Sequence, residues 1–203
     1  SALARRFSTP EDQIPSIVQQ MAEILLSAKK PVLYAGGGCN TKESFDEIGK
    51  FLDSYKCAVV TSLMGIGAVS KKAENNFGMV GMHGSYAANR AMHDADVVLA
   101  AGVRFDDRAT GVISKFCPNA KIIHIDIDAA EINKILPSYC SLVCDVESAF
   151  PLITAKLAGK ESENAGARDE WVKSLKKTFD ENGDAVEVVT QSVGFRRFEM
   201  KDG

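Results

Sequence analysis

The chain of 203 residues has no hydrophobic run near the roughly 20 residues that a membrane-spanning helix needs. It also lacks an excess of basic residues, because 24 Lys and Arg stand against 27 Asp and Glu, giving a formal net charge of −3 and a pI near 5.7. Proteins that bind nucleic acid concentrate basic residues on one face, so this balance argues against nucleic acid as a partner. No basic segment followed by an apolar stretch opens the chain. We therefore expect a cytoplasmic protein with no signal peptide and no membrane partner.

The sequence is also poor in the side chains that build metal and catalytic centres. It has three histidines, and its five cysteines include no C-x-x-C pair. Cys140 and Cys144 are close in sequence, but no histidine lies near them to complete a zinc site. We find no nucleophile accompanied by a base and an orienting group, and no pair of catalytic carboxylates. We therefore expect no metal site, no catalytic residue, and buried, reduced cysteines in a cytosol-like compartment.

What the sequence does contain is an alternation of helical and strand patterns. The spacing of apolar residues predicts helices from residue 11 up to Pro31 and over 42–55, 85–93, 129–134 and 147–157. Short apolar runs predict buried strands over 32–35, 58–61, 95–101, 121–125 and 141–143. In the second helix we expect Phe45, Ile48, Phe51 and Leu52 to face inward. Strands this apolar, alternating with helices, predict an α/β fold in which a parallel sheet is covered on both faces.

The unusual residue clusters all fall where a predicted strand ends. The clusters are Gly36-Gly37-Gly38, Ser62-Leu63-Met64, Gly102-Val103-Arg104, Asp126-Ile127 and Asp145. In an open parallel sheet, ligands bind outside the carboxyl ends of the strands. This coincidence predicts a ligand site at that edge of the sheet.

Each cluster also has an interpretation that needs no ligand. The three glycines let backbone amides approach an anion, but they equally suit a flexible strand-to-helix turn and do not match G-x-G-x-x-G. Arg104 and Arg108 suit a pyrophosphate, and they also suit ion pairs with the aspartates between them. Asp126 and Asp145 suit either ribose hydroxyls or helix caps. His83 is either a structural residue or a cofactor contact.

Several strings, in this order, resemble the central domain of one enzyme family. They are KPVLYAGGGC (30–39), TSLMGIG (61–67), GMHG (81–84), GVRFDDRATG (102–111) and IHIDID (123–128). Together they are similar to acetohydroxyacid synthase, also called acetolactate synthase large subunit, over residues 5–157. GVRFDDR and GMHG occurring together are highly specific. The resemblance implies a Rossmann-like α/β fold, with a six-stranded parallel sheet and helices on both faces, that holds FAD.

The resemblance also assigns FAD-binding positions. It implies that Arg5 contacts the flavin nucleotide and that Gly36, Gly37 and Gly38 form the glycine turn beside the diphosphate. The other implied contacts are Thr61, Leu63, Met82 and His83 along the flavin and ribityl chain, Gly102, Arg104, Asp106 and Arg108 along the cofactor, and Asp126, Ile127, Asp145 and Val146 at the adenosine end.

In this family FAD takes no redox part in the reaction. The chemistry belongs to thiamine diphosphate, held with magnesium, whose ylid attacks pyruvate, loses carbon dioxide and condenses with a second 2-oxo acid in branched-chain amino-acid biosynthesis. The activating glutamate and the GDG…N metal motif belong to the family's two other domains, and this chain shows neither. The resemblance therefore predicts a central-domain fragment that is inactive alone. Its expected partners are the flanking domains, further copies in a homo-oligomer and a regulatory subunit.

We divide the chain into a linker (1–10), a central FAD-binding domain (11–159) and a C-terminal region (160–203). That last region begins as a polar linker and continues as an amphipathic helix with Trp171, Val172, Leu175 and Phe179 on one stripe, before an atypical tail. Two alternatives stay open. One is a stand-alone nucleotide-binding or assembly module, and the other is a fragment of a different thiamine enzyme, such as pyruvate oxidase or glyoxylate carboligase.

Overall fold

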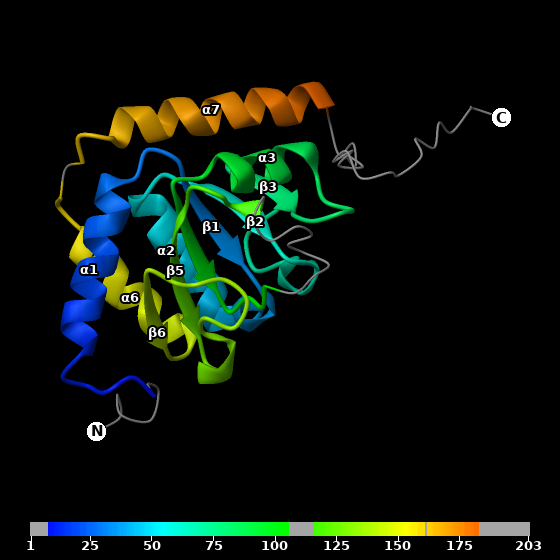
Figure 1. The fold of residues 1–203 in the computed structure, drawn as a ribbon. Coiled ribbons are helices and arrows are strands. Elements are labelled where there is room, and N and C mark those ends of the chain that lie inside the picture. Colours follow the sequence, from blue (N-terminus) through cyan, green and yellow to red (C-terminus); the bar gives the residue numbers. More distant parts are fainter. Residues whose placement is uncertain (1–7, 106–115, 161, 183–203) are drawn as a thin grey trace.

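One six-stranded sheet organises the protein, whose computed structural model describes residues 8–105, 116–160 and 162–182 (Figure 1). All strands are parallel, in the order β3-β2-β1-β4-β5-β6. Their bounds are β1 Pro31–Ala35, β2 Ala58–Thr61, β3 Asn76–Met79, β4 Val97–Ala101, β5 Lys121–Asp126 and β6 Cys140–Val143. The predicted α/β class and parallel sheet are confirmed.

Helices cover both faces of the sheet, as Figure 1 shows. On one face lie α1 (Ile14–Ser27), α2 (Lys42–Ser54) and α6 (Val146–Leu157). On the other lie α3 (Tyr86–Asp94) and α7 (Ala165–Asn182). In the described part of the chain, single turns of 3-10 helix follow strand ends at Gly37–Cys39, Leu63–Gly65 and Ala129–Glu131.

The strands are buried on both sides, which explains why they read as continuous apolar runs rather than as alternating ones. In β1, Leu33 joins the core beneath α1, α2 and α6, whereas Val32 and Tyr34 join the core beneath α3 and α7. All five cysteines are buried and unpaired. Burial raises the pKa of the Cys39 thiol to about 12, so this side chain stays protonated and behaves as a small apolar residue.

Three local predictions need correction. Asn76–Met79 forms the edge strand β3, which is absent from the predicted strands. The helix expected over 129–134 is a single 3-10 turn, Ala129–Glu131, which Asp128 caps by accepting from Ala130 N. Phe45 is 40% exposed, because Ser44 faces inward in its place and donates to Glu147 Oε2 at 3.0 Å.

The C-terminal helix starts earlier than its apolar stripe indicated. We expected a polar linker from residue 160 up to the stripe that starts at Trp171, but α7 begins at Ala165. The side chains of Trp171, Val172 and Leu175 enter the same core as α3, and the ring of Phe179 lies 6.1 Å from that of Phe77. The amphipathic helix is thus confirmed, and its apolar stripe completes the cover over the α3 face.

Candidate functional site

The glycines at the ends of β1 and β4 pack against each other, backbone to backbone. A Cβ atom on Gly36 would lie 2.1 Å from the carbonyl oxygen of Gly102, and one on Gly102 would lie 2.6 Å from the Cα of Gly38. The N–H groups of Gly36 and Gly38 donate to Ala101 O at 2.9 Å and Gly102 O at 3.0 Å. Within the described residues, only the Gly37 N–H of the triplet makes no hydrogen bond. The glycines therefore serve strand packing first, and one amide of the three is free for an anion.

The first turn of α2, which follows this glycine turn, already holds a carboxylate. Thr41 caps the helix by accepting from Ser44 N at 3.0 Å. Glu147, in the first turn of α6, accepts hydrogen bonds from the hydroxyls of both Thr41 and Ser44, at 3.2 and 3.0 Å. A protein side chain thus occupies the place where a helix N-terminus would otherwise attract a phosphate.

Arg104 follows β4 and places an exposed cation at this edge. Its side chain is 74% exposed, and its Nε lies 3.8 Å from Glu131 Oε1, which also accepts from Lys134 Nζ at 2.9 Å. The Glu131 side chain is only 10% exposed, but the 3.8 Å separation is longer than a hydrogen bond and the arginine is open to solvent, so the pair is weak. The guanidinium is therefore available to an anionic ligand. Asp106 and Arg108, like Arg5, lie outside the described residues.

Asp126 and Asp145 end the neighbouring strands β5 and β6, as predicted. Asp126 is largely buried, and its Oδ1 accepts from Asp128 N at 2.9 Å. Asp145 precedes α6 in the capping position, yet its side chain makes no capping hydrogen bond. Helix capping is therefore not the use of either carboxylate, since the cap of the turn after β5 is Asp128. For Asp145 this favours the ligand interpretation, whereas Asp126 already holds the turn after β5 through Asp128 N.

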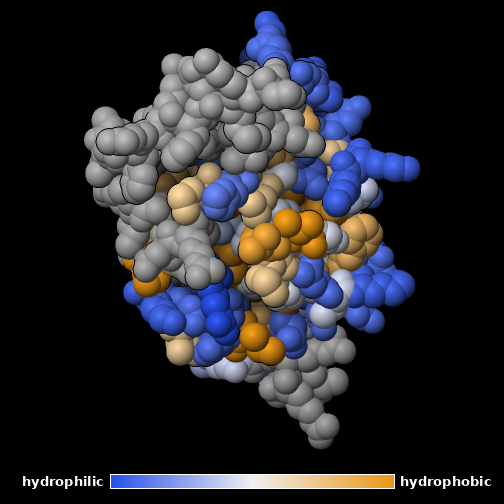
Figure 2. All heavy atoms as spheres, turned by 90° about the vertical axis from the view of Figure 1, so that its right-hand side faces the viewer, coloured by the Kyte–Doolittle hydropathy of each residue, from blue (hydrophilic) through white to orange (hydrophobic). Residues whose placement is uncertain are grey.

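Large apolar side chains lie exposed at the same edge. Leu63, Met64, Met82 and Ile127 are 66, 71, 61 and 66% exposed. Figure 2 views the side toward which β1 points in Figure 1 and shows hydrophobic side chains gathered there. His83 is also exposed, whereas Thr61 and Val146 are buried. An apolar surface beside free polar groups is the usual composition of a small-molecule site.

Sequence reasoning missed two members of this edge. Glu131, the partner of Arg104, gave no signal beyond an acidic residue in a polar stretch. Asn40 was passed over although it follows the glycine turn, and its amide donates to the carbonyl of Met64, joining the turns after β1 and β2. Long-range pairs of this kind become visible only in the fold.

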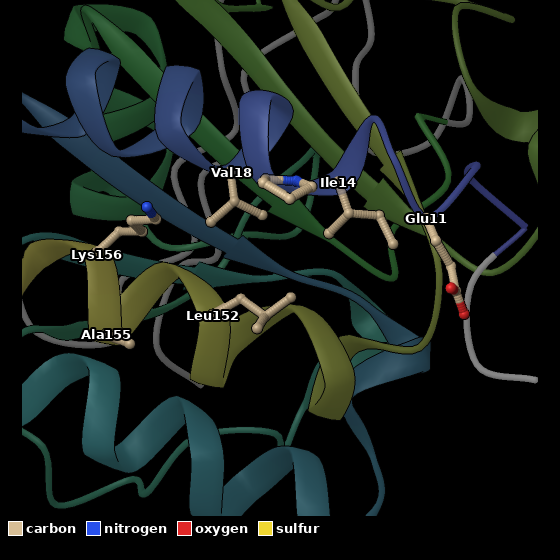
Figure 3. Close-up of a pocket in the computed structure, with 7 residues that line it drawn as sticks. Glu11, Ile14, Val18, Leu152, Ala155 and Lys156 are labelled. Carbon is tan, nitrogen blue, oxygen red and sulfur yellow. The ribbon is translucent and has the colours of Figure 1, made fainter. Parts of the chain in front are cut away.

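A separate open groove lies between α1 and α6 (Figure 3). Its lining is Ile14, Pro15, Val18, Leu152 and Ala155, with Glu11 and Lys156 toward its ends. It contains none of the predicted ligand contacts. Among the described residues, no group of His, Cys, Asp or Glu is arranged to hold a metal ion, and no helix is both long and apolar enough to cross a membrane.

Comparison with known proteins agrees with this fold. The family model described as thiamine pyrophosphate enzyme, central domain, matches residues 18–153. The chain belongs to this family. The six strands of the sheet all lie between residues 18 and 153, so the match covers the whole sheet and its carboxyl edge.

Similar full-length proteins are acetolactate synthase large subunits. That of Buchnera aphidicola is 39% identical over 160 residues, which are 79% of this chain and 28% of the relative. That of Haemophilus influenzae is 47% identical over 133 residues, 66% of this chain and 23% of the relative. Isozyme 2 of Escherichia coli is 36% identical over 187 residues, 89% of this chain and 33% of the relative. The predicted resemblance is confirmed, and the chain spans about a third or less of these relatives.

Proposed function

We propose that this chain is the FAD-binding central portion of an acetolactate synthase large subunit. The observation that carries the proposal is that three polar groups meet at one sheet edge: the Gly37 N–H, the exposed Arg104 guanidinium, and the Asp145 carboxylate. The relatives at 36–47% identity are named acetolactate synthases, which favours this enzyme over pyruvate oxidase or glyoxylate carboligase.

The residues present fit a flavin dinucleotide. Gly37 and Arg104 suit the diphosphate, because an amide N–H and a guanidinium both donate to anionic oxygens. Asp126 and Asp145 suit the ribose of the adenosine half, with Ile127 beside them. Leu63 and Met82 offer an apolar surface for the flavin ring, next to Thr61 and His83. We retain Arg5, Asp106, Arg108, Gly36, Gly38, Gly102 and Val146 as contacts on the strength of the resemblance.

When bound, FAD would act here as a structural cofactor. The condensation of two 2-oxo acids would use thiamine diphosphate and magnesium held by other portions of the longer protein, and we propose that this chain alone is inactive. We further propose the cytoplasm as its location, with flanking domains, further copies of the chain and a regulatory subunit as partners.

Titration of the purified chain with FAD, followed by quenching of flavin fluorescence, tests the proposal. Saturable binding is expected, with ADP competing if the adenosine half lies at Asp126 and Asp145. Replacing Arg104 by Ala should weaken binding about tenfold or more, the usual worth of a charge-assisted hydrogen bond. The control is Arg90→Ala, which removes another exposed arginine, on α3, that pairs weakly with a carboxylate, Asp94, at 3.5 Å.

Two results would overturn the proposal. One is a folded chain that shows no saturable binding of FAD. The other is equal affinity of the wild type and Arg104→Ala, which would place the cofactor away from this edge.

A further inference from the structure

His124 is a buried residue with chemical capacity that the proposed site does not use. It lies in β5 beside Ala100 of β4, and its side chain is 1% exposed. Its imidazole ring meets the ring of Phe105 edge to face, with 5.3 Å between centroids and 75° between planes. Phe105 comes directly after Arg104 in the chain, so this contact holds the backbone on the C-terminal side of Arg104.

A hydrogen bond holds the backbone on the N-terminal side of Arg104. His124 Nε2 lies 3.1 Å from the carbonyl oxygen of Val103, the residue directly before Arg104. A carbonyl oxygen only accepts, so Nε2 carries the proton and donates. The other ring nitrogen, Nδ1, is buried and has no hydrogen-bond partner within the described residues. The ring is therefore held by Val103 and Phe105, not by a network of its own.

The backbone at this point needs such support. Gly102 has a φ of +54°, so the chain turns sharply as it leaves β4. Val103 and Phe105 are buried while Arg104 between them is exposed. A buried carbonyl without a donor is costly, and His124 supplies the donor for Val103.

We propose that His124 is a positioning residue that holds the Val103–Phe105 backbone and thereby presents Arg104 to the anionic part of the ligand. The inference rests on the proposed function for the identity of that ligand. The geometry on which it depends does not, since both contacts exist without a ligand.

A matched pair of variants separates this role from mere filling of space. In His124→Gln the side-chain amide nitrogen can reach the position of Nε2 and donate to Val103 O. In His124→Asn the amide is one carbon shorter and corresponds to Nδ1 instead. We expect FAD affinity close to wild type for His124→Gln and about tenfold weaker for His124→Asn, the usual worth of one buried hydrogen bond. On an Arg104→Ala background the two variants should bind FAD equally, because no arginine remains to be positioned.

Amide hydrogen exchange of the ligand-free chain gives the second readout. The reporter is the amide of Gly102, directly before Val103, which donates to Ile125 O at 2.8 Å. Its exchange should be faster in His124→Asn than in His124→Gln, with Leu33 in β1 protected equally in both. If wild type binds no FAD, the proposed function fails and this exchange difference alone decides the inference. Equal exchange at Gly102 in the two variants would overturn it, as would equal FAD affinity where the wild type binds. A loss of protection at Leu33 as well as at Gly102 would show a merely structural role and would also overturn it.

Discussion

The two edges of the sheet differ in how their polar groups are used. At the amino edge, where the strands begin, side chains close the backbone. Asp96 accepts from the N–H groups of Lys29 and Lys30 at 2.7 and 2.9 Å, joining the starts of β1 and β4. Asn75 donates to the carbonyl of Cys57 at 2.8 Å, ahead of β2. These side chains stabilise the fold, and the polar atoms that make these hydrogen bonds are not free to bind a ligand.

The same edge includes the last carbonyls of α1, which distant side chains satisfy. Tyr55 donates to Leu25 O at 2.5 Å, and Ser162 donates to Leu26 O at 2.6 Å. Arg168 of α7 donates to Ala28 O at 3.3 Å, and its guanidinium lies 4.8 Å from the centre of the Tyr55 ring. These contacts fix the start of α7 to the end of α1.

The carboxyl edge is the opposite. There Arg104 is exposed, Asp145 makes no capping bond, and large apolar side chains face outward. Its backbone is nevertheless packed tightly through Gly36 and Gly102. Side chains stabilise the fold at both edges, since Glu147 and Asn40 also hold turns at the carboxyl edge. Among the described residues, only the carboxyl edge adds exposed groups that the fold does not need, and we propose that these serve a ligand or partner.

The largest expected effect comes from the backbone packing at the carboxyl edge. In Gly36→Ala the new Cβ would lie 2.1 Å from Gly102 O and 2.5 Å from the Cα of Val103, both backbone atoms that cannot move aside cheaply. We expect the free energy of unfolding to fall by about 3 kcal/mol. Gly49→Ala is the control, because Gly49 lies inside α2 with open space around it and should gain about 0.5–1 kcal/mol. Urea unfolding followed by circular dichroism measures both, and equal midpoints would contradict the packing role.

Two arginines then sharpen the contrast between the edges. Arg168 is 5% exposed, and in Arg168→Leu the Ala28 carbonyl and the Ser162 hydroxyl lose a donor. We expect a loss of about 2–3 kcal/mol. Arg104→Leu should change stability by less than about 0.5 kcal/mol, because its side chain is exposed and weakly paired. The comparison fails if unfolding in urea gives similar losses for the two.

A smaller effect is expected in the dependence of stability on pH. Burial lowers the pKa of His124 below its ordinary value, although the hydrogen bond to Val103 and the charges of Asp126 and Glu131 oppose this. At pH values above about 6.5 the histidine is neutral in the folded and the unfolded chain and contributes no slope. As pH falls below 6.5, the unfolded chain binds a proton that the folded chain does not. Stability should therefore fall, by at most about 1.4 kcal/mol per pH unit, until the folded pKa is reached.

Urea unfolding at intervals between pH 7.5 and 5 measures this slope. His124→Gln has no titrating group at the position and should show a flatter profile over the same interval. His93→Gln is the control, because it removes a histidine whose side chain is exposed rather than buried. Parallel profiles for the wild type and His124→Gln would show that another group is responsible.

Local sequence patterns predicted most of the fold and the edge of the sheet at which the candidate site lies. Continuous apolar runs such as Val97–Ala101 identify buried parallel strands, and the residues that follow them necessarily meet at one edge. β3 was missed because Asn76, Gly78 and its short length carry little strand signal, and its partner β2 supplies the pairing. Arg168 was missed because a charged residue in a polar stretch reads as solvated, whereas its burial depends on α1 and Tyr55, more than a hundred residues away.

The same limit applies to α7. Its apolar stripe was visible, but nothing local showed that its first turn is bonded to α1. The match to isozyme 2 of Escherichia coli, at 89% of this chain, is long enough to include nearly all of α7. The core contacts of α7 and the length of this match therefore agree that α7 belongs to the same domain as the sheet, although the family model ends at residue 153.

The smallest effect on stability, and the most direct test of the open edge, concerns self-association. Leu63 and Met64 are more than half exposed, so changing both to Gln should alter the free energy of unfolding by less than about 0.5 kcal/mol. The same change should reduce association of the chain with itself, because an exposed apolar patch seeks a partner. Sedimentation velocity at rising protein concentration measures this, with Tyr139→Gln as a control that removes an exposed ring ahead of β6, at the amino edge. If the carboxyl edge is the surface left for partners, the Leu63/Met64 variant stays monomeric where wild type and Tyr139→Gln associate. A wild-type chain that remains a sharp monomer at high concentration would instead show that this apolar surface is too small to bind a partner without its ligand.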